Sequence, residues 1–170
     1  MLKNCSDYCD VRYGEDLLMS AHFISECEKI VYLKAGLYHY RVRPGSAVHS
    51  FDIHRKDSIK TVHTELEKCI DEWGMPELKP LHNLRKVRGW MDTLVILLKN
   101  KSAMSNAEFH NQLTSMAEDP YFLTAYSNMN KSRLSGHYQF LSSCLAKKQY
   151  FVLHAYGNLY QAVRKLKSGR

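Results

Sequence analysis

The apolar positions in residues 14–28 repeat with the spacing of one helix face. Leu17, Ala21 and Ile24 lie three and four residues apart, which places their side chains on the same side of an α-helix. Gly14 precedes the first of these positions and marks the start of the pattern. The spacing therefore predicts a helix that begins close to Gly14.

Two short segments rich in β-branched and aromatic residues follow this helix. Residues 29–33 and 37–42 flank Lys34-Ala35-Gly36, a sequence typical of a tight turn. We expect a short β-hairpin or extended pair near residues 29–43. Pro44-Gly45 then breaks the pattern, and a loop is expected to lead to about residue 50.

The remainder of the chain, residues 51–170, has only helical periodicities. Gly74 followed by Pro76 predicts a helix end, Ser105 with Glu108 matches a capping box, and Asp119-Pro120 is a signal for the end of one helix and the start of another. We therefore expect a mainly α fold, with a bundle of about five helices after residue 51. The apolar stripes comprise Ile59, Val62, Leu66, Cys69, Ile70 and Trp73; Leu81, Leu84, Val87, Met91, Leu94, Val95 and Leu98; Phe109, Leu113 and Met116; Leu134, Tyr138, Leu141 and Leu145; and Leu153, Tyr156, Tyr160 and Val163.

The composition is that of a globular protein, with 45% apolar and 24% charged residues among 170. The longest apolar run, from Leu94 to Leu98, is far shorter than the roughly 20 residues that a transmembrane helix needs. The first residues also lack the apolar stretch of a signal peptide. We expect a cytoplasmic protein, with any membrane association peripheral and at the inner face of the cell membrane.

The net charge of +7 is concentrated at the C-terminal end. Residues 120–170 contain eight of the 24 Lys and Arg residues and none of the 17 Asp and Glu residues. A basic segment can approach nucleic acid, an anionic membrane or an acidic partner. The aromatic residues are not interleaved with the basic ones in a recognisable nucleic-acid module, so we expect no nucleic-acid partner and favour an anionic membrane surface contacted through residues 147–170.

The aromatic residues of the helical region are interpreted as packing residues, and its histidines are too scattered in sequence to predict a metal cluster. The five cysteines are an odd number, which favours reduced thiols over a disulfide framework. Cys5 and Cys9 have no second Cys or His pair at the spacing of a structural zinc site.

Three features follow one another within residues 13–46. The first is Tyr13-Gly14-Glu15-Asp16-Leu17-Leu18, the second is Lys29-Ile30-Val31-Tyr32-Leu33, and the third is Leu37-Tyr38-His39-Tyr40-Arg41-Val42-Arg43-Pro44-Gly45-Ser46. In this order and spacing they resemble the second half of the catalytic domain of family 2 glycosyltransferases with the GT-A fold. The resemblance covers about residues 1–50, which we interpret as the C-terminal remnant of such a domain, followed by a helical region at residues 51–170.

The resemblance implies a role for the paired carboxylates. Asp16 would be the general base that removes the proton of an acceptor hydroxyl as it attacks the anomeric carbon of a nucleotide sugar, and Glu15 would contact the acceptor or orient the helix. The alternative is that both carboxylates only interact with the helix dipole, at about 0.3–1 kcal/mol each. The expected reaction belongs to the synthesis of cell-envelope or capsular polysaccharide.

The loop after the predicted hairpin resembles the one that closes over the donor diphosphate. Arg41, Arg43 and Ser46 would contact the diphosphate, because Arg can bind two phosphate oxygens at once. His49 would be a metal ligand. The alternative is a solvated strand end for the arginines and an exposed loop position for the histidine.

The chain has no Asp-x-Asp motif and no Gly-rich phosphate loop after a strand. Only 13 residues precede Gly14, whereas the family binds its nucleotide and its Mg or Mn ion mainly with an N-terminal half. The chain is therefore interpreted as a truncated C-terminal portion, with no cofactor bound and no turnover by itself. A non-catalytic helical module, docking by its basic C-terminus on an anionic membrane or acidic partner, is the alternative function, and self-association as a homo-oligomer is a further expectation.

Overall fold

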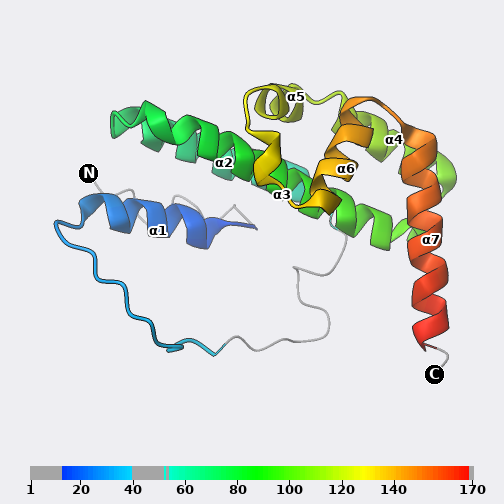
Figure 1. Ribbon diagram of the computed structural model, residues 1–170, viewed down its shortest axis with the longest axis horizontal. Coiled ribbons are helices and arrows are strands. Elements are labelled where there is room, and N and C mark those ends of the chain that lie inside the picture. Colours follow the sequence, from blue (N-terminus) through cyan, green and yellow to red (C-terminus); the bar gives the residue numbers. More distant parts are fainter. Residues whose placement is uncertain (1–12, 40–51, 53, 169–170) are drawn as a thin grey trace. The chain divides into compact units, whose positions relative to one another are not determined.

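The computed structural model describes residues 13–39, 52 and 54–168, with side chains described up to residue 163 (Figure 1). The chain divides into two compact units, Met1–Gly74 and Met75–Arg170. The sequence predicts its own boundary near residue 50, outside the described residues. The predicted boundary marks the end of the residues that resemble a known family. The observed boundary, at Gly74, lies between two packed units.

The first unit contains two α-helices that pack against each other. They are α1 (Glu15–Glu26) and α2 (Arg55–Glu72). Their shared core consists of Leu18, Val62 and Leu66, with Leu17 and Ala21 half-buried at its edge. The face predicted for α2 therefore packs against α1 through Val62 and Leu66. In α1 the prediction is only partly right, because Ile24 is 55% exposed and the fully buried Leu18 was not assigned to the face.

The C-terminal end of α2 follows its sequence signals. The helix stops at Glu72, where the N–H of Trp73 still donates to the carbonyl of Cys69 at 2.9 Å. Gly74 then takes a positive φ of 64°, which turns the chain out of the helix. The half-buried Trp73 is therefore the last residue of the α2 stripe.

The segment between α1 and α2 forms no helix and no strand in its described part, residues 27–39. One turn-like hydrogen bond, from Leu37 N to Ala35 O at 3.1 Å, lies at the predicted tight turn. A strand is stabilised by its ladder of hydrogen bonds to a neighbour, and none is formed here among the described residues. Residues 40–43, the end of the predicted hairpin, lie outside them.

The second unit is entirely helical in its described part. Its α-helices are α3 (Lys79–Lys99), α4 (Asn106–Ala117), α5 (Pro120–Ser127), α6 (Gly136–Ala146) and α7 (Tyr150–Ser168), joined in part by the short 3₁₀ helices η2 (Pro76–Leu78), η3 (Lys101–Ala103) and η4 (Lys131–Arg133). With α2, the described chain has six α-helices beyond residue 51, where about five are predicted. The mainly α fold class is confirmed.

Helix α3 is the centre of the second unit, because α5, α6 and α7 all pack against it. Leu84, Val87, Met91, Leu94 and Leu98 are buried, as the apolar stripe predicts. Leu81 is the exception, since 52% of it is exposed in the first turn of the helix.

The stripe also misses Trp90, which is fully buried. The indole Nε1–H of Trp90 donates to the carbonyl of Met116 at 3.1 Å, which satisfies the polar atom of the ring inside the core. Its ring also lies 5.3 Å from that of Tyr121. Trp90 therefore links α3 to the end of α4 and the start of α5.

Three α-helices of the second unit, α4, α5 and α6, begin with a side-chain cap. Ser105 and Glu108 form the predicted capping box at α4, and Asp119 accepts a hydrogen bond from Tyr121 N at α5. Ser135 accepts one from Tyr138 N at α6. These caps satisfy N–H groups that have no partner within the helix, and each contributes about 1 kcal/mol.

Helix α7 approaches the C-terminal end of α3 closely. A Cβ atom at Gly157 would lie 3.1 Å from Cδ of Lys101, so a larger residue there would require that side chain to shift by a few tenths of an ångström. Nζ of the buried Lys101 donates to Asn158 Oδ1 at 2.6 Å and to the carbonyl of His154 at 3.3 Å. The side chain of Gln161 donates to the carbonyl of Lys99. Polar contacts therefore hold one face of α7 in place.

No helix in the described part of the chain has both the length and the apolar content needed to span a bilayer.

Candidate functional site

The Gly-Glu-Asp motif forms the start of α1. Gly14 has a φ of +89°, in the left-handed region that glycine adopts readily, and a Cβ there would lie 3.2 Å from Cγ2 of Val62 in α2. The first residue of the motif thus has two physical reasons to be glycine. Both concern the packing of α1 on α2.

Glu15 and Asp16 occupy the first turn of α1 with exposed side chains. Oδ1 of Asp16 accepts a hydrogen bond from the backbone N–H of Leu17 at 2.8 Å, which orients the carboxylate at the helix start. Because Gly14 has no side chain to cap the helix, nothing from that residue covers the two acids. The arrangement presents an oriented carboxylate to solvent, which is what a general base acting on an external hydroxyl requires.

A polar cluster lies beside the first residue of the motif. The hydroxyl of Tyr13 donates to Oδ2 of Asp52 at 3.2 Å, and Oδ1 of Asp52 accepts from His54 N at 2.9 Å. The guanidinium of Arg55 lies over the Tyr13 ring, with Cζ 4.7 Å from the centroid. Asp52 and Arg55 were not predicted as site residues, since nothing in their local sequence distinguishes them from an ordinary helix start.

Arg55 is the most unusual member of this cluster. Its Nε and Nη1 atoms are buried and have no hydrogen-bond partner within the described part of the chain. Buried donors of this kind normally form a hydrogen bond. Because Nε and Nη1 form none among the described residues, the Arg55 guanidinium can still donate to another group close to Tyr13. It is a positive group near the predicted catalytic turn.

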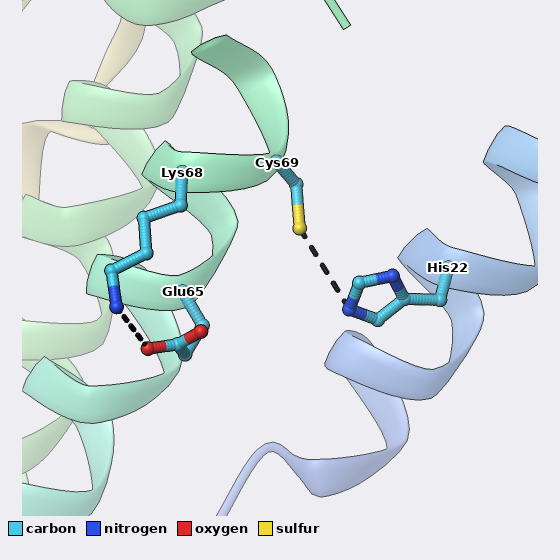
Figure 2. A network of polar contacts seen from close by, with 4 residues as sticks. All are labelled: His22, Glu65, Lys68 and Cys69. Carbon is cyan, nitrogen blue, oxygen red and sulfur yellow. Dashed lines mark hydrogen bonds and ion pairs between the residues drawn. The ribbon is translucent and has the colours of Figure 1, made fainter. Parts of the chain in front are cut away.

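A Cys-His pair joins α1 to α2 further along. Nε2 of His22 lies 3.8 Å from Sγ of Cys69, and Lys68 pairs with Glu65 at 2.7 Å on α2 (Figure 2). The thiol of Cys69 could act as a nucleophile only if a substrate reached it, but the residue is only 3% exposed. We interpret the pair as part of the packing between the helices.

Among the residues that the structure describes, Cys27, Cys69 and Cys144 form no disulfide.

The remaining predicted site residues cannot be placed beside Asp16. Arg41, Arg43, Ser46 and His49 lie outside the described residues. Within the described residues, no three His, Cys, Asp or Glu side chains come close enough together to hold a metal ion.

The second unit contains a histidine pair that the sequence does not predict. The rings of His110 and His154 lie 5.8 Å apart, and the His154 ring meets Phe109 edge-on at 4.8 Å. Burial lowers the pKa of His154, and the neighbouring charges of Lys101 and His110 lower it further. Burial also lowers the pKa of Lys101. The pair has no acidic partner in these contacts and is a packing element of α4 and α7.

A second unusual titratable group lies between α3 and α6. The hydroxyl of Tyr138 donates to Oδ1 of Asp92 in a short hydrogen bond. Burial, followed by the hydrogen bond and charge of Asp92, raises the pKa of Tyr138 to about 12. The hydroxyl therefore stays protonated at neutral pH and acts as a donor that ties the two helices together.

Comparison with models of known protein families, with curated proteins and with solved structures found no match to this chain. Assignment of a function therefore depends on the motif and on the geometry around α1.

Proposed function

We propose that this chain is the C-terminal part of a glycosyltransferase that transfers a sugar from a nucleotide-sugar donor to an acceptor hydroxyl of a cell-envelope polysaccharide. The observation that carries the proposal is the Gly14-Glu15-Asp16 turn. Two exposed carboxylates lie at the start of α1, and one of them is oriented by a backbone hydrogen bond. The motif resembles that of family 2 glycosyltransferases in both sequence and position.

In the proposed reaction, Asp16 takes the proton of the acceptor hydroxyl while the oxygen attacks the anomeric carbon. The bond from that carbon to the nucleotide diphosphate breaks, and the diphosphate leaves with the electron pair. Asp16 suits this role because its side chain is exposed to the acceptor and is held at the helix start. Arg41, Arg43 and Ser46 would bind the diphosphate.

The segment between the helices supports the same proposal. Residues 29–39 are exposed throughout, although most of residues 30–33 and 37–38 are large and apolar. Tyr32, for example, is 87% exposed. Apolar runs of this kind are typical of strands covered on both faces. In the intact enzyme, the sheet of the donor-binding half would cover them.

The test compares transferase activity in the protein expressed with its upstream coding sequence. Asp16→Asn should lower kcat by about 10²–10⁴-fold, because general-base catalysis contributes about that much. Asp57→Asn is the matched control, since Asp57 is also an exposed acid in the first turn of a helix, α2. This control should retain full activity.

Equal kcat values for the two variants would refute the base assignment. The two variants could instead show small and equal losses of stability, with no specific loss of activity in Asp16→Asn. That result would show that both acids act only on the helix dipoles.

A further inference from the structure

Helix α7 has two faces of opposite kind. Leu153 and Gly157 are buried against the second unit, as described above. Phe151 and Leu159, on another side of the helix, are 86% and 63% exposed. Both belong to an exposed row at helical spacing, which comprises Phe151, Ala155, Leu159, Ala162 and Val163. We call this row the outer face of α7.

Phe151 on the outer face is an exception to the interpretation of the aromatic residues of this region as packing residues. Phe122 is fully buried, but Phe151 has almost no protein contact. Phe140 of α6 is also exposed, and its ring lies 6.4 Å from that of Tyr156 in α7. Single exposed apolar residues are ordinary, whereas an apolar row of this length marks a surface that binds something.

The charge of the sequence that contains α7 indicates what the outer face binds. Lys147 is exposed in the turn before α7, and the sequence adds Arg164, Lys165 and Lys167 near the end of the helix. No acidic residue occurs after Asp119. A row of apolar residues together with positive charge complements an anionic lipid surface, where apolar side chains enter the interface and basic ones meet the headgroups.

Charge also argues against a second copy of this chain as the partner that binds the outer face. Two outer faces packed together would bring two basic segments into proximity with no acidic residue in either segment to pair with them. Lys148 does pair with an acid, Glu118 at 2.6 Å, but that contact lies within the unit.

We propose that the outer face of α7 docks on an anionic lipid surface, with α7 lying in the plane of the interface. Phe151 and Leu159 enter the boundary between headgroups and acyl chains, and the basic residues contact anionic headgroups. This surface goes beyond the proposed transferase activity and does not depend on it. It would hold the protein at the membrane where lipid-linked or envelope substrates are found.

The test is flotation of the full chain with vesicles of equal parts phosphatidylcholine and phosphatidylglycerol, compared with phosphatidylcholine alone. We expect binding to the anionic vesicles at low salt that weakens as salt is added. The variant Phe151→Ser/Leu159→Ser should reduce vesicle partitioning at least about tenfold, because two large apolar side chains no longer enter the interface. Lys147→Gln should reduce it by about fivefold at low salt.

Leu81→Ser/Leu123→Ser is the matched control. These leucines, in α3 and α5, are also exposed, but neither belongs to the outer face. Circular dichroism should show full helix content in both double variants, since all four side chains lie at the surface. The control should bind the anionic vesicles as the unmodified chain does.

Three results would overturn the proposal. They are an absence of flotation with anionic vesicles at low salt, equal flotation of the two double variants, and a dimer in solution that Phe151→Ser/Leu159→Ser converts to monomer while vesicle binding is unchanged. The last result would assign the outer face to self-association.

Discussion

The two units of this chain are stabilised in different ways. In the described part of the first unit, the core between α1 and α2 consists of three buried apolar residues, and neither helix has a side-chain cap. The second unit surrounds α3 with three packed helices and begins α4, α5 and α6 with side-chain caps. The small core and the uncapped helix starts give the contact between α1 and α2 few interactions to offset the entropy of ordering these helices.

The side chains that could take part in a reaction follow the same division between the units. The exposed carboxylates, the guanidinium with free donors and the exposed apolar segment all belong to the first unit. In its described part, the second unit has a well-filled core and an exposed apolar row on α7. Groups that act on a substrate must remain accessible, so the less densely packed unit is where the reaction is expected.

The largest effect should come from the core of the second unit. Leu94→Ala should lower its free energy of unfolding by about 3 kcal/mol, because the fully buried side chain leaves a cavity beside α3. Leu81→Ala, in the same helix but half-exposed, should change it by less than about 0.5 kcal/mol. Urea denaturation followed by circular dichroism measures both. Similar losses in the two variants would contradict the central place of α3.

A smaller effect is expected at the start of α1. Gly14→Ala should destabilise the packing of α1 on α2 by about 2 kcal/mol, since it combines a left-handed backbone with a close contact to Val62. Gly36→Ala is the control, because no atom lies within 4 Å of its added Cβ. Hydrogen exchange of residues 15–26 should become faster in Gly14→Ala alone. Unchanged exchange there would mean that Gly14 is not needed for the packing.

The smallest effect should be a dependence on pH in the second unit. The folded state lowers the pKa of His154, so the unfolded chain binds more protons between that lowered pKa and the ordinary value of about 6.5. Stability should therefore fall as the pH decreases through this window and stay level above it. His154→Gln should remove this part of the pH dependence in urea titrations, and an identical profile in that variant would contradict the burial of a neutral imidazole.

Much of the fold could be predicted from the sequence, because helical periodicity and helix-end signals are local. The capping box at Ser105, the helix end at Gly74 and most of the α3 stripe are found as expected. The boundary between units could not be predicted, because it depends on α2 packing against α1 across a long intervening segment. Trp90 was missed because the stripe was traced through its aliphatic neighbours, although the residue lies at the helix centre.

The candidate site could be predicted only in part. Glu15 and Asp16 are predicted from a motif, and the structure places both at the exposed start of a helix; their catalytic role stays a prediction. Asp52 and Arg55 come close to Tyr13 only after the chain folds back, so no local signal identifies them. The same is true of His110 and His154, which are far apart in sequence and adjacent in space.

The division at Gly74 also separates the two tryptophans of the chain. Trp73 ends α2 in the first unit and is half-buried, whereas Trp90 lies fully buried in the second. Each unit thus has its own intrinsic fluorophore, and the buried indole should emit at a shorter wavelength than the partly solvated one. Single-tryptophan variants would follow the melting of either unit separately, and their transitions would reveal whether the two halves unfold together or in turn.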